Sequence, residues 1–401
     1  MHPLVKPALR RGWRDLNTVQ FGMTPAHAMT VGPMDTATGS FLDLLNGTRG
    51  LALLRAEGRR MDLPDGHVDA LVERLSRAGL VDDACGGGPA VEALRAKQEV
   101  MDRLGPDLAS LSLITPEPGG AIGRLAARRA LRVQVRGAGR VGVTLAALLS
   151  GAGVGEVDVR DVGRVQPWDV APGGLPAEAV GERRDEAARR VVRRAAPDRT
   201  PRRPDPAAEE PGLSLVIIAP RDDVLVYAPD ARAAEPLMAS GTPHLYTGVV
   251  EGTGVVGPLV LPGGTGCARC LHEHRSDRDP AWPRLIAQWR SGQARRVEAC
   301  DLTLATAVAG LAAAHALAFL DGESPSGTGV RWEASVPALH WHARPVWPHS
   351  ACPCGAAEKA KGEHSSTNEA RHETMVVQRP SAERQEHTDA ARPTGTWRAH
   401  V

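Results

Sequence analysis

Four of the six cysteines stand in two closely spaced pairs, and this spacing is typical of a zinc site. One pair is Cys267 and Cys270, and the other is Cys352 and Cys354. Zinc binds four thiolates in a closed tetrahedral site, and one short turn can present two sulfurs to the same ion. The ion would join two distant segments and fix the last strands onto their domain. We therefore predict a structural zinc ion, and no catalytic zinc, because no fourth position stays open.

A glycine-rich turn predicts a nucleotide site. An apolar, β-branched run leads into Gly137, Gly139 and Gly142, and a helix, a strand and then Asp161 follow. Gly137 allows a tight turn, Gly139 lets the backbone approach a phosphate, and Gly142 lets helix and strand pack closely. The helix that begins there offers unpaired N–H groups to an anion. Asp161 stands at about the distance along the chain at which an acid meets a ribose hydroxyl. Arg140, which lies inside the turn, is also predicted to contact the nucleotide.

The elements that must position both sites predict an α/β fold. Strand, turn, helix and strand alternate through the nucleotide segment in the order of a βαβ unit. Further strands are expected at 214–218, 244–248 and 255–261, and the last of them leads to the first cysteine pair. Residues 330–347 supply the remaining strands. We expect a Rossmann-like domain over residues 131–357.

The longest uncharged stretch, 302–320, is long enough to cross a membrane. It is rich in Ala and Thr, contains His315, and is bounded by Asp301 and Asp321. These features favour a helix buried in a soluble core, so no membrane partner is expected. The start of the chain lacks the apolar core of a signal peptide. Together with the paired cysteines, this predicts a cytoplasmic protein.

Composition argues against nucleic acid as the main partner. The 401 residues carry a formal net charge of +1, so no large field of one sign would attract a polyanion. Aromatic residues make up only 3%, which leaves little material for base stacking. The length gives room for two or three domains. After Gly355 the chain becomes polar and charged, so residues 358–401 are expected to form a disordered tail.

Two passages resemble the ThiF/MoeB-type, ubiquitin-activating-like adenylyltransferases. Residues 152–157 with Asp161 look like the opening of that family's nucleotide segment, and residues 261–271 resemble its zinc-knuckle entry. The resemblance covers roughly residues 125–357. It implies a Rossmann-type fold that holds ATP with magnesium and adenylates the C-terminal carboxylate of a small protein. It also implies a homodimer.

Three positions depart from the pattern of active relatives. Pro172 stands where the family has an arginine that reaches the triphosphate, and Arg184 stands in place of a lysine. Arg184 can still contact a phosphate, although it is not equivalent to lysine. An ungapped comparison puts Arg221 at the magnesium-binding acid, and Asp222 or Asp223 can serve only if the loop shifts. Magnesium neutralises developing charge, so these losses would weaken catalysis and leave the fold unchanged.

Cys300 is a candidate nucleophile. It precedes the apolar helix, where several relatives also carry a cysteine. A helix N-terminus lowers the pKa of a thiol and can prepare it to form a thioester or persulfide. The alternative is a partly buried thiol without a catalytic role.

Residues 1–85 predict a separate small domain. Runs of β-forming residues at 18–21 and 29–31 predict a hairpin, and three short helices are expected after it. This winged-helix pattern resembles the PqqD-like peptide-recognition domains, in which a leader peptide adds as a strand to the hairpin edge. A DNA-binding winged helix or a dimerisation module is the alternative. No dense basic recognition helix supports DNA binding.

Residues 86–130 are expected to link the small domain to the Rossmann-like domain. Helices are predicted at 90–104 and at 119–130. Between them, 110–114 is apolar enough for an edge strand.

The resemblance leaves two functions open. The first is ATP-dependent adenylation of the C-terminus of a small protein or precursor peptide. The second is a scaffold that has lost adenylation and presents a leader peptide to a partner cyclodehydratase, as in thiazole/oxazole-modified peptide systems. The intact glycine turn and Asp161 favour the first. Pro172, Arg221 and the front domain favour the second.

Overall fold

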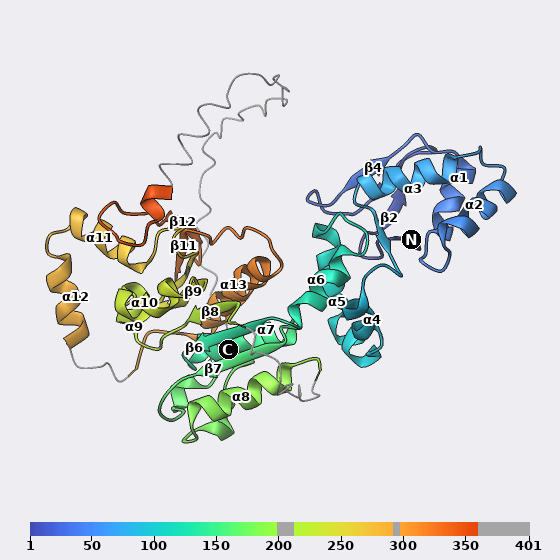
Figure 1. Ribbon diagram of the computed structural model, residues 1–401. Coiled ribbons are helices and arrows are strands. Elements are labelled where there is room, and N and C mark those ends of the chain that lie inside the picture. Colours follow the sequence, from blue (N-terminus) through green and yellow to red (C-terminus); the bar gives the residue numbers. More distant parts are fainter. Residues whose placement is uncertain (199–211, 292–296, 360–401) are drawn as a thin grey trace, which may run out of the picture. The chain divides into compact units, whose positions relative to one another are not determined.

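The largest sheet lies in the part of the chain that holds both predicted sites. The computed structural model describes residues 1–198, 212–291 and 297–359. The sheet has seven strands in the spatial order β12-β11-β10-β9-β8-β6-β7 (Figure 1). They are β6 (Arg132–Arg136), β7 (Glu156–Arg160), β8 (Leu215–Ile218), β9 (His244–Val250), β10 (Thr253–Val260), β11 (Val330–Ser335) and β12 (His342–Pro345). The predicted tail lies outside the described residues from 360 onward.

Strand direction divides this sheet into two parts. The strands β7, β6, β8 and β9 run parallel to one another, whereas β10 pairs antiparallel with β9, β11 with β10, and β12 with β11. Central parallel strands need continuous apolar runs because both of their faces are covered. β8 has such a run, and it lies between β6 and β9. The predicted α/β fold is confirmed, and the carboxyl ends of β6, β7 and β8 share one edge of the sheet.

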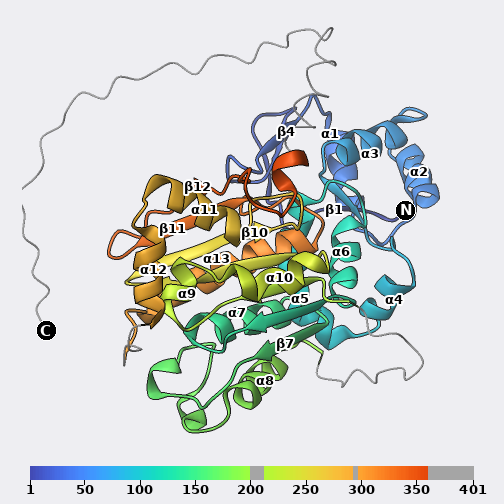
Figure 2. The same ribbon diagram turned by 60° about the vertical axis from the view of Figure 1, so that its left-hand side comes forward.

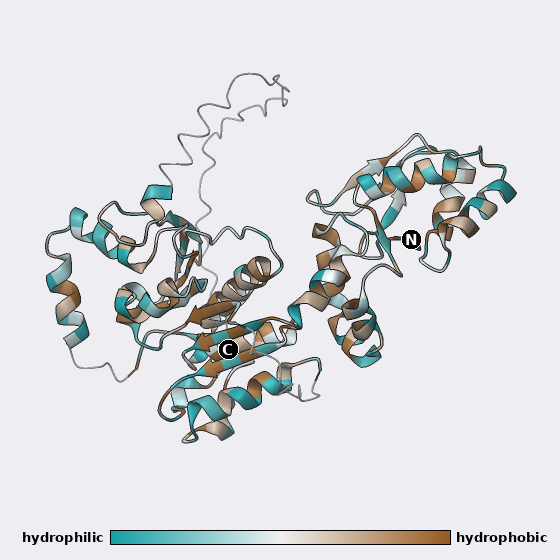
Figure 3. Ribbon diagram, in the orientation of Figure 1, coloured by the Kyte–Doolittle hydropathy of each residue, from teal (hydrophilic) through white to brown (hydrophobic). Residues whose placement is uncertain are grey.

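Helices α7 (Arg140–Gly151), α8 (Arg184–Ala195) and α13 (Leu302–Leu320) pack with the strands into one apolar cluster. Figure 3 shows apolar colouring on the central strands and on α13, whereas much of α8 is hydrophilic. The remaining elements of this part are α9 (Asp223–Tyr227), α10 (Ala231–Ala239), α11 (Ala268–Arg278), α12 (Trp282–Ser291) and the 3-10 turns η2 (Pro167–Asp169) and η3 (Ala177–Ala179). α12 packs against α9 and α11, and Figure 2 shows α11 and α12 near each other at one end of the sheet.

α13 is a helix long and apolar enough to cross a membrane by length and composition, with a mean hydropathy of 1.8. One face of it, with residues four apart, is buried in the core: Leu304, Val308, Ala312 and Ala316. Residues at this spacing lie on one side of a helix. The buried face agrees with the core helix that the sequence predicts.

The N-terminal part has two small antiparallel sheets and three helices. β2 (Arg11–Trp13), β3 (Val19–Phe21) and β4 (Met29–Val31) form one sheet, and β1 (Pro3–Val5) pairs with β5 (Val81–Asp83). The helices are α1 (Thr36–Phe41), α2 (Leu51–Arg60) and α3 (His67–Arg77), with the 3-10 turn η1 (Leu42–Leu44). The predicted hairpin is confirmed as β3 and β4. These elements enclose their own apolar cluster, which includes Phe21, Phe41 and Leu75.

Three helices follow: α4 (Pro89–Arg95), α5 (Gln98–Ile114) and α6 (Gly120–Arg128). The edge strand predicted at 110–114 is wrong, because these residues form the last turn of α5. Leu104, Leu108 and Leu111 follow the helical spacing and pack in a third apolar cluster with α6. The ammonium of Lys6 donates to the carbonyls of Ser112 and Thr115 at 2.6 and 2.8 Å, which suits a cation at a helix C-terminus. The boundaries at 85, 130 and 357 stay predictions.

Candidate nucleotide site and metal centre

The glycine turn lies at the carboxyl end of β6 and leads into α7. Gly137 has φ of +119°, and a Cβ there would overlap the carbonyl oxygen of Ala219 at the end of β8. A Cβ on Gly142 would overlap the carbonyl oxygen of Gly137. No larger side chain fits at either position, so the turn closes tightly between β8 and the first turn of α7.

Asp161 lies beside this turn, at the end of β7. Its carboxylate accepts hydrogen bonds from the backbone N–H groups of Ala138 and Val162, each at 2.6 Å. It lines a crevice of about 1040 Å³, which we call the nucleotide crevice. The structure therefore brings Asp161 and the glycine turn together, at the edge of a parallel sheet where ligands bind.

Arg184 reaches the same place from α8. It is 8% exposed, and its guanidinium lies 3.4 Å from Asp161 and 3.1 Å from Asp169. It also donates to the carbonyl of Val162 at 2.8 Å. These contacts hold the loop after β7 in place. Arg184 also lines the nucleotide crevice.

Asp169 is the residue of this site that the sequence analysis missed. It is 3% exposed, and one of its oxygens lies 2.8 Å from the guanidinium of Arg221. The Arg221 side chain crosses Gly139, since a Cβ on Gly139 would lie 3.0 Å from its Cγ. No local pattern marks this acid, because its partners Arg184 and Arg221 are 15 and 52 residues away.

Asp222 also lines the nucleotide crevice. Its carboxylate accepts from the N–H of Leu225 at 3.0 Å and caps α9. The ungapped comparison placed Arg221 at the magnesium-binding acid and left Asp222 or Asp223 available through a shift of the loop, and which residue holds magnesium stays a prediction. Both side chains lie at the crevice, so a carboxylate is present after β8.

Arg140 and Cys300 meet at a smaller pocket of about 90 Å³ that opens beside Gly139. Arg140 donates to the carbonyl of Cys300 at 2.7 Å. Burial raises the pKa of the Cys300 thiol to about 11. The lowered thiol pKa that the nucleophile hypothesis requires is not found, because burial dominates; the carboxylate of Asp301, which caps α13 by accepting from Thr303 and Leu304 at 3.0 Å, raises the pKa further. Burial also raises the pKa of Glu298, which lines the same pocket, to about 7.

The four paired cysteines come together as one cluster. Adjacent sulfurs are 3.6 to 3.8 Å apart: Cys267 to Cys270, Cys267 to Cys352, and Cys270 to Cys354. A tetrahedral zinc with bonds of about 2.3 Å places its sulfurs about 3.8 Å apart. Three of the cysteines are buried and one is half-buried. This donor set fits a closed structural zinc site.

A second group, His274, Asp277 and His349, also lies close together. Nδ1 of His349 accepts from the N–H of Ala351 at 3.1 Å, so the ring proton is on Nε2. Nε2 then donates to Asp277 at 2.8 Å. These contacts make the group a hydrogen-bonded support for the loop before Cys352.

Comparisons with known proteins agree with this geometry. The model of the ThiF family matches residues 113–356. The structure of E. coli MccB with ATP matches with a TM-score of 0.62 at 14% identity, over 88% of this chain and 99% of that chain. The microcin C7 biosynthetic enzyme MccB with N-formylated MccA gives 0.61 and 13%, over 88% and 100%. PaaA gives 0.61 and 14%, over 86% and 100%. No curated protein sequence matches the chain.

The family match spans more than half of the chain, and the chain therefore belongs to the ThiF family. The Rossmann-type domain expected from the sequence is confirmed. At these identities the solved structures show a shared fold, and that likeness extends well beyond the family match to most of the chain.

Proposed function

We propose that this protein binds a precursor peptide or small protein and activates a carboxylate of it by adenylation with ATP. The observation that carries the proposal is the nucleotide crevice, where the glycine turn, Asp161, Arg184 and Asp222 lie at the carboxyl ends of three parallel strands. MccB, which shares the fold, has been solved with ATP and with MccA. The proposal places the phosphates at the glycine turn and the ribose at Asp161.

Each residue has a distinct part in the reaction. A carboxylate oxygen of the peptide attacks the α-phosphorus, the bond to the β-phosphate oxygen breaks, and pyrophosphate leaves with that electron pair. The N–H groups at the start of α7 bind phosphate oxygens. Magnesium, held by Asp222, would neutralise charge on the leaving phosphates. Arg221, which crosses Gly139, would turn from Asp169 to the triphosphate and supply the positive charge that Pro172 does not.

The front part is proposed to dock the peptide. Its three-stranded sheet has two outer strands, β2 and β4, and each carries an exposed apolar side chain. Trp13 on β2 is 50% exposed and Met29 on β4 is 42% exposed. A peptide can add to such an edge as a further strand. The winged-helix, PqqD-like assignment, a homodimer and a cytoplasmic location belong to the same proposal.

The second candidate is a scaffold without adenylation that presents the peptide to a cyclodehydratase. One observation favours it: the ion pair between Arg221 and Asp169 holds a side chain where a phosphate would approach Gly139. In this case Arg221 blocks the phosphate position instead of binding the triphosphate.

The variant Arg221→Ala separates the two candidates. Adenylation predicts that it weakens binding of ATP with magnesium by at least tenfold, because a phosphate-binding charge is lost. The scaffold predicts unchanged or tighter ATP binding, because the block is removed. Arg183→Ala is the matched control, since Arg183 is an exposed arginine paired with Asp185. Isothermal titration calorimetry of ATP with magnesium into the zinc-loaded full chain measures the ATP affinity of both variants.

A further inference from the structure

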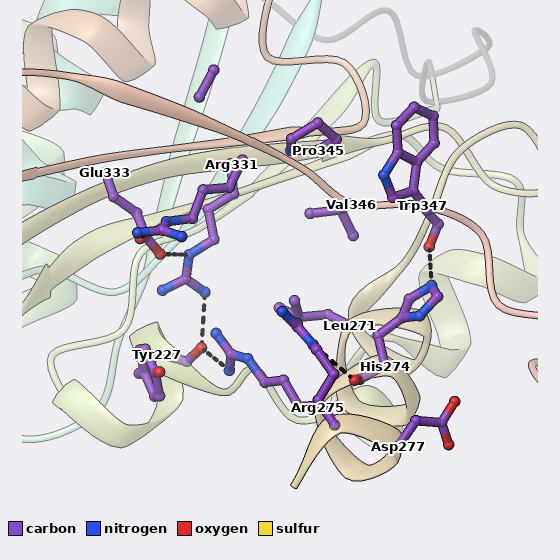
Figure 4. A pocket seen from close by; sticks show the side chains of 13 residues that line it. Tyr227, Leu271, His274, Arg275, Asp277, Arg331, Glu333, Pro345, Val346 and Trp347 are labelled. Atoms are coloured by element: carbon purple, nitrogen blue, oxygen red, sulfur yellow. Dashed lines mark hydrogen bonds and ion pairs between the residues drawn. The ribbon is translucent and has the colours of Figure 1, made fainter.

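Four arginines line a pocket of about 760 Å³ outside the nucleotide crevice, between α11 and the strands β11 and β12. They are Arg275, Arg278, Arg331 and Arg344. Only two acids, Asp277 and Glu333, line the same pocket, so its wall carries an excess of two positive charges. We call it the arginine pocket, and Figure 4 shows it.

Two of these arginines, Arg275 and Arg331, are held close together by a shared hydrogen-bond acceptor. Arg275 and Arg331 both donate to the carbonyl oxygen of Tyr227, at 2.9 and 2.8 Å (Figure 4). The Arg275 guanidinium also lies 4.2 Å above the Tyr227 ring and 4.8 Å from the Trp282 ring. Burial lowers the pKa of Arg275 to about 10, so it is still charged at neutral pH. Two like charges on one carbonyl repel each other unless an anion lies near them.

The two acids of the pocket already have partners, and neither of them pairs with Arg275. One oxygen of Glu333 binds Arg331 and the other binds Arg344, each at 2.7 Å. Asp277 faces His349 at 2.8 Å. Among the described residues, Arg275 has no carboxylate partner, and Nη2 of the 2% exposed Arg331 has no hydrogen-bond partner. A desolvated cation without a counter-charge is costly, and a carboxylate from a ligand would offset that cost.

The arginine pocket adjoins the nucleotide crevice through a third pocket, of about 780 Å³, which we call the bridging pocket. The bridging pocket shares Tyr227, Arg331 and Glu333 with the arginine pocket. It shares Asp222 and Glu298 with the crevice. Because neighbouring pockets share wall residues, we place an extended peptide, which advances about 3.3 Å per residue, along the three in turn.

Charge distinguishes the two ends of this route from its middle. The bridging pocket is lined by acids, among them Asp222, Asp223 and Glu251, and these would repel a carboxylate. The arginine pocket also has an apolar wall, from Leu271, Val346 and Trp347, which suits the methylene stem of a side chain better than a bare ion.

We propose that the arginine pocket binds an acidic side chain, Asp or Glu, of the peptide substrate, at a residue upstream of the carboxylate that enters the nucleotide crevice. This assignment rests on the proposed function and adds a substrate class to it. It makes the protein selective for acidic peptides, and it makes Arg275 a specificity-determining residue.

The test uses acetylated hexaglutamate and hexaglutamine peptides, titrated by calorimetry into the zinc-loaded full chain. We expect hexaglutamate to bind at least tenfold more tightly than hexaglutamine, and Arg275→Gln to remove that preference. Arg344→Gln, at a side chain that is 69% exposed, should weaken hexaglutamate binding about threefold and tests the pocket without disturbing buried packing. Arg232→Gln, at an exposed arginine on α10, is the matched control and should change nothing.

Equal affinity for the two peptides, or hexaglutamate binding that survives both Arg275→Gln and Arg344→Gln, would overturn the assignment. Inorganic phosphate that competes fully with hexaglutamate at equal concentration would also overturn it, since the pocket would then hold free anions. ATP titration of Arg275→Gln keeps the two proposals apart. The ATP affinity of Arg275→Gln should equal that of the wild type. If the wild type itself does not bind ATP, that result contradicts the proposed adenylation and leaves the assignment of the arginine pocket to the peptide titrations.

Discussion

At the scale of single residues, the crevice depends on Asp169. This buried acid holds Arg184 from α8 and Arg221 from the loop after β8, and so it joins the two sides of the nucleotide crevice. Its backbone N–H and carboxylate also close a capping box with Gln166. A single carboxylate therefore determines where two arginines point.

Asp169→Asn should lower the free energy of unfolding by about 3 kcal/mol, because it removes the buried carboxylate that pairs with Arg221 and leaves Arg184 with Asp161 alone. Urea unfolding, followed by circular dichroism, measures the change. Asp43→Asn is the control: Asp43 is 67% exposed in its pair with Arg11, and its loss should cost less than about 1 kcal/mol. Equal effects of the two changes would show that Asp169 is not a buried junction.

Glu298 gives the crevice a pH dependence. Burial raises its pKa from 4.5 to about 7, so it is neutral well below pH 7 and a carboxylate above it. A carboxylate repels the triphosphate, so affinity for ATP without magnesium should fall by about fivefold from pH 6 to pH 8. In Glu298→Gln, only the part of this fall in affinity that comes from ionisation of the ATP phosphates should remain. An identical pH profile in the variant would remove Glu298 from the site.

The site residues differ in how far the sequence predicts them. The four clustered cysteines and the glycine turn are predicted because short spacings carry the chemistry. Asp169 is not, because its role comes from partners distant in the chain. The pKa of Cys300 is predicted in the wrong direction, since burial and the Asp301 cap act on it and neither is visible in local sequence.

At the scale of elements, the packing of α7 against the turn depends on Gly142. Gly142→Ala should lower the free energy of unfolding by about 3 kcal/mol, because the added methyl overlaps the carbonyl of Gly137. Gly310→Ala, inside α13 and facing open space, should instead stabilise the protein by about 1 kcal/mol. Urea unfolding of both variants checks this, and a neutral Gly142→Ala would contradict the tight turn.

Elements with long apolar runs are predicted well, and α13 and the central parallel strand β8 are examples. The segment 110–114 is assigned wrongly because five apolar or small residues fit a strand as well as a helix. What decides it is the third apolar cluster, where Leu104 and Leu111 of α5 meet α6. Tertiary contacts of this kind cannot be predicted from a short segment of sequence.

At the scale of the whole molecule, the cysteine cluster joins the segment after β10 to the segment after β12. We expect about one zinc per chain by elemental analysis. Cys352→Ser should lose the metal and lower the melting temperature by more than about 10 °C, because metal binding contributes directly to folding. Cys85→Ser, at the exposed cysteine, should keep both. A wild-type protein that contains no zinc and is indifferent to a chelator would contradict the structural site.

The central claim is that the crevice of this ThiF-family protein binds ATP. Calorimetric titration of ATP with magnesium into the zinc-loaded full chain tests it most directly. The account predicts binding with a micromolar Kd that is lost in Asp161→Ala and kept in Asp43→Ala. The absence of any heat of binding at millimolar ATP, with zinc content and near-ultraviolet circular dichroism intact, would contradict it and leave the peptide-presenting scaffold.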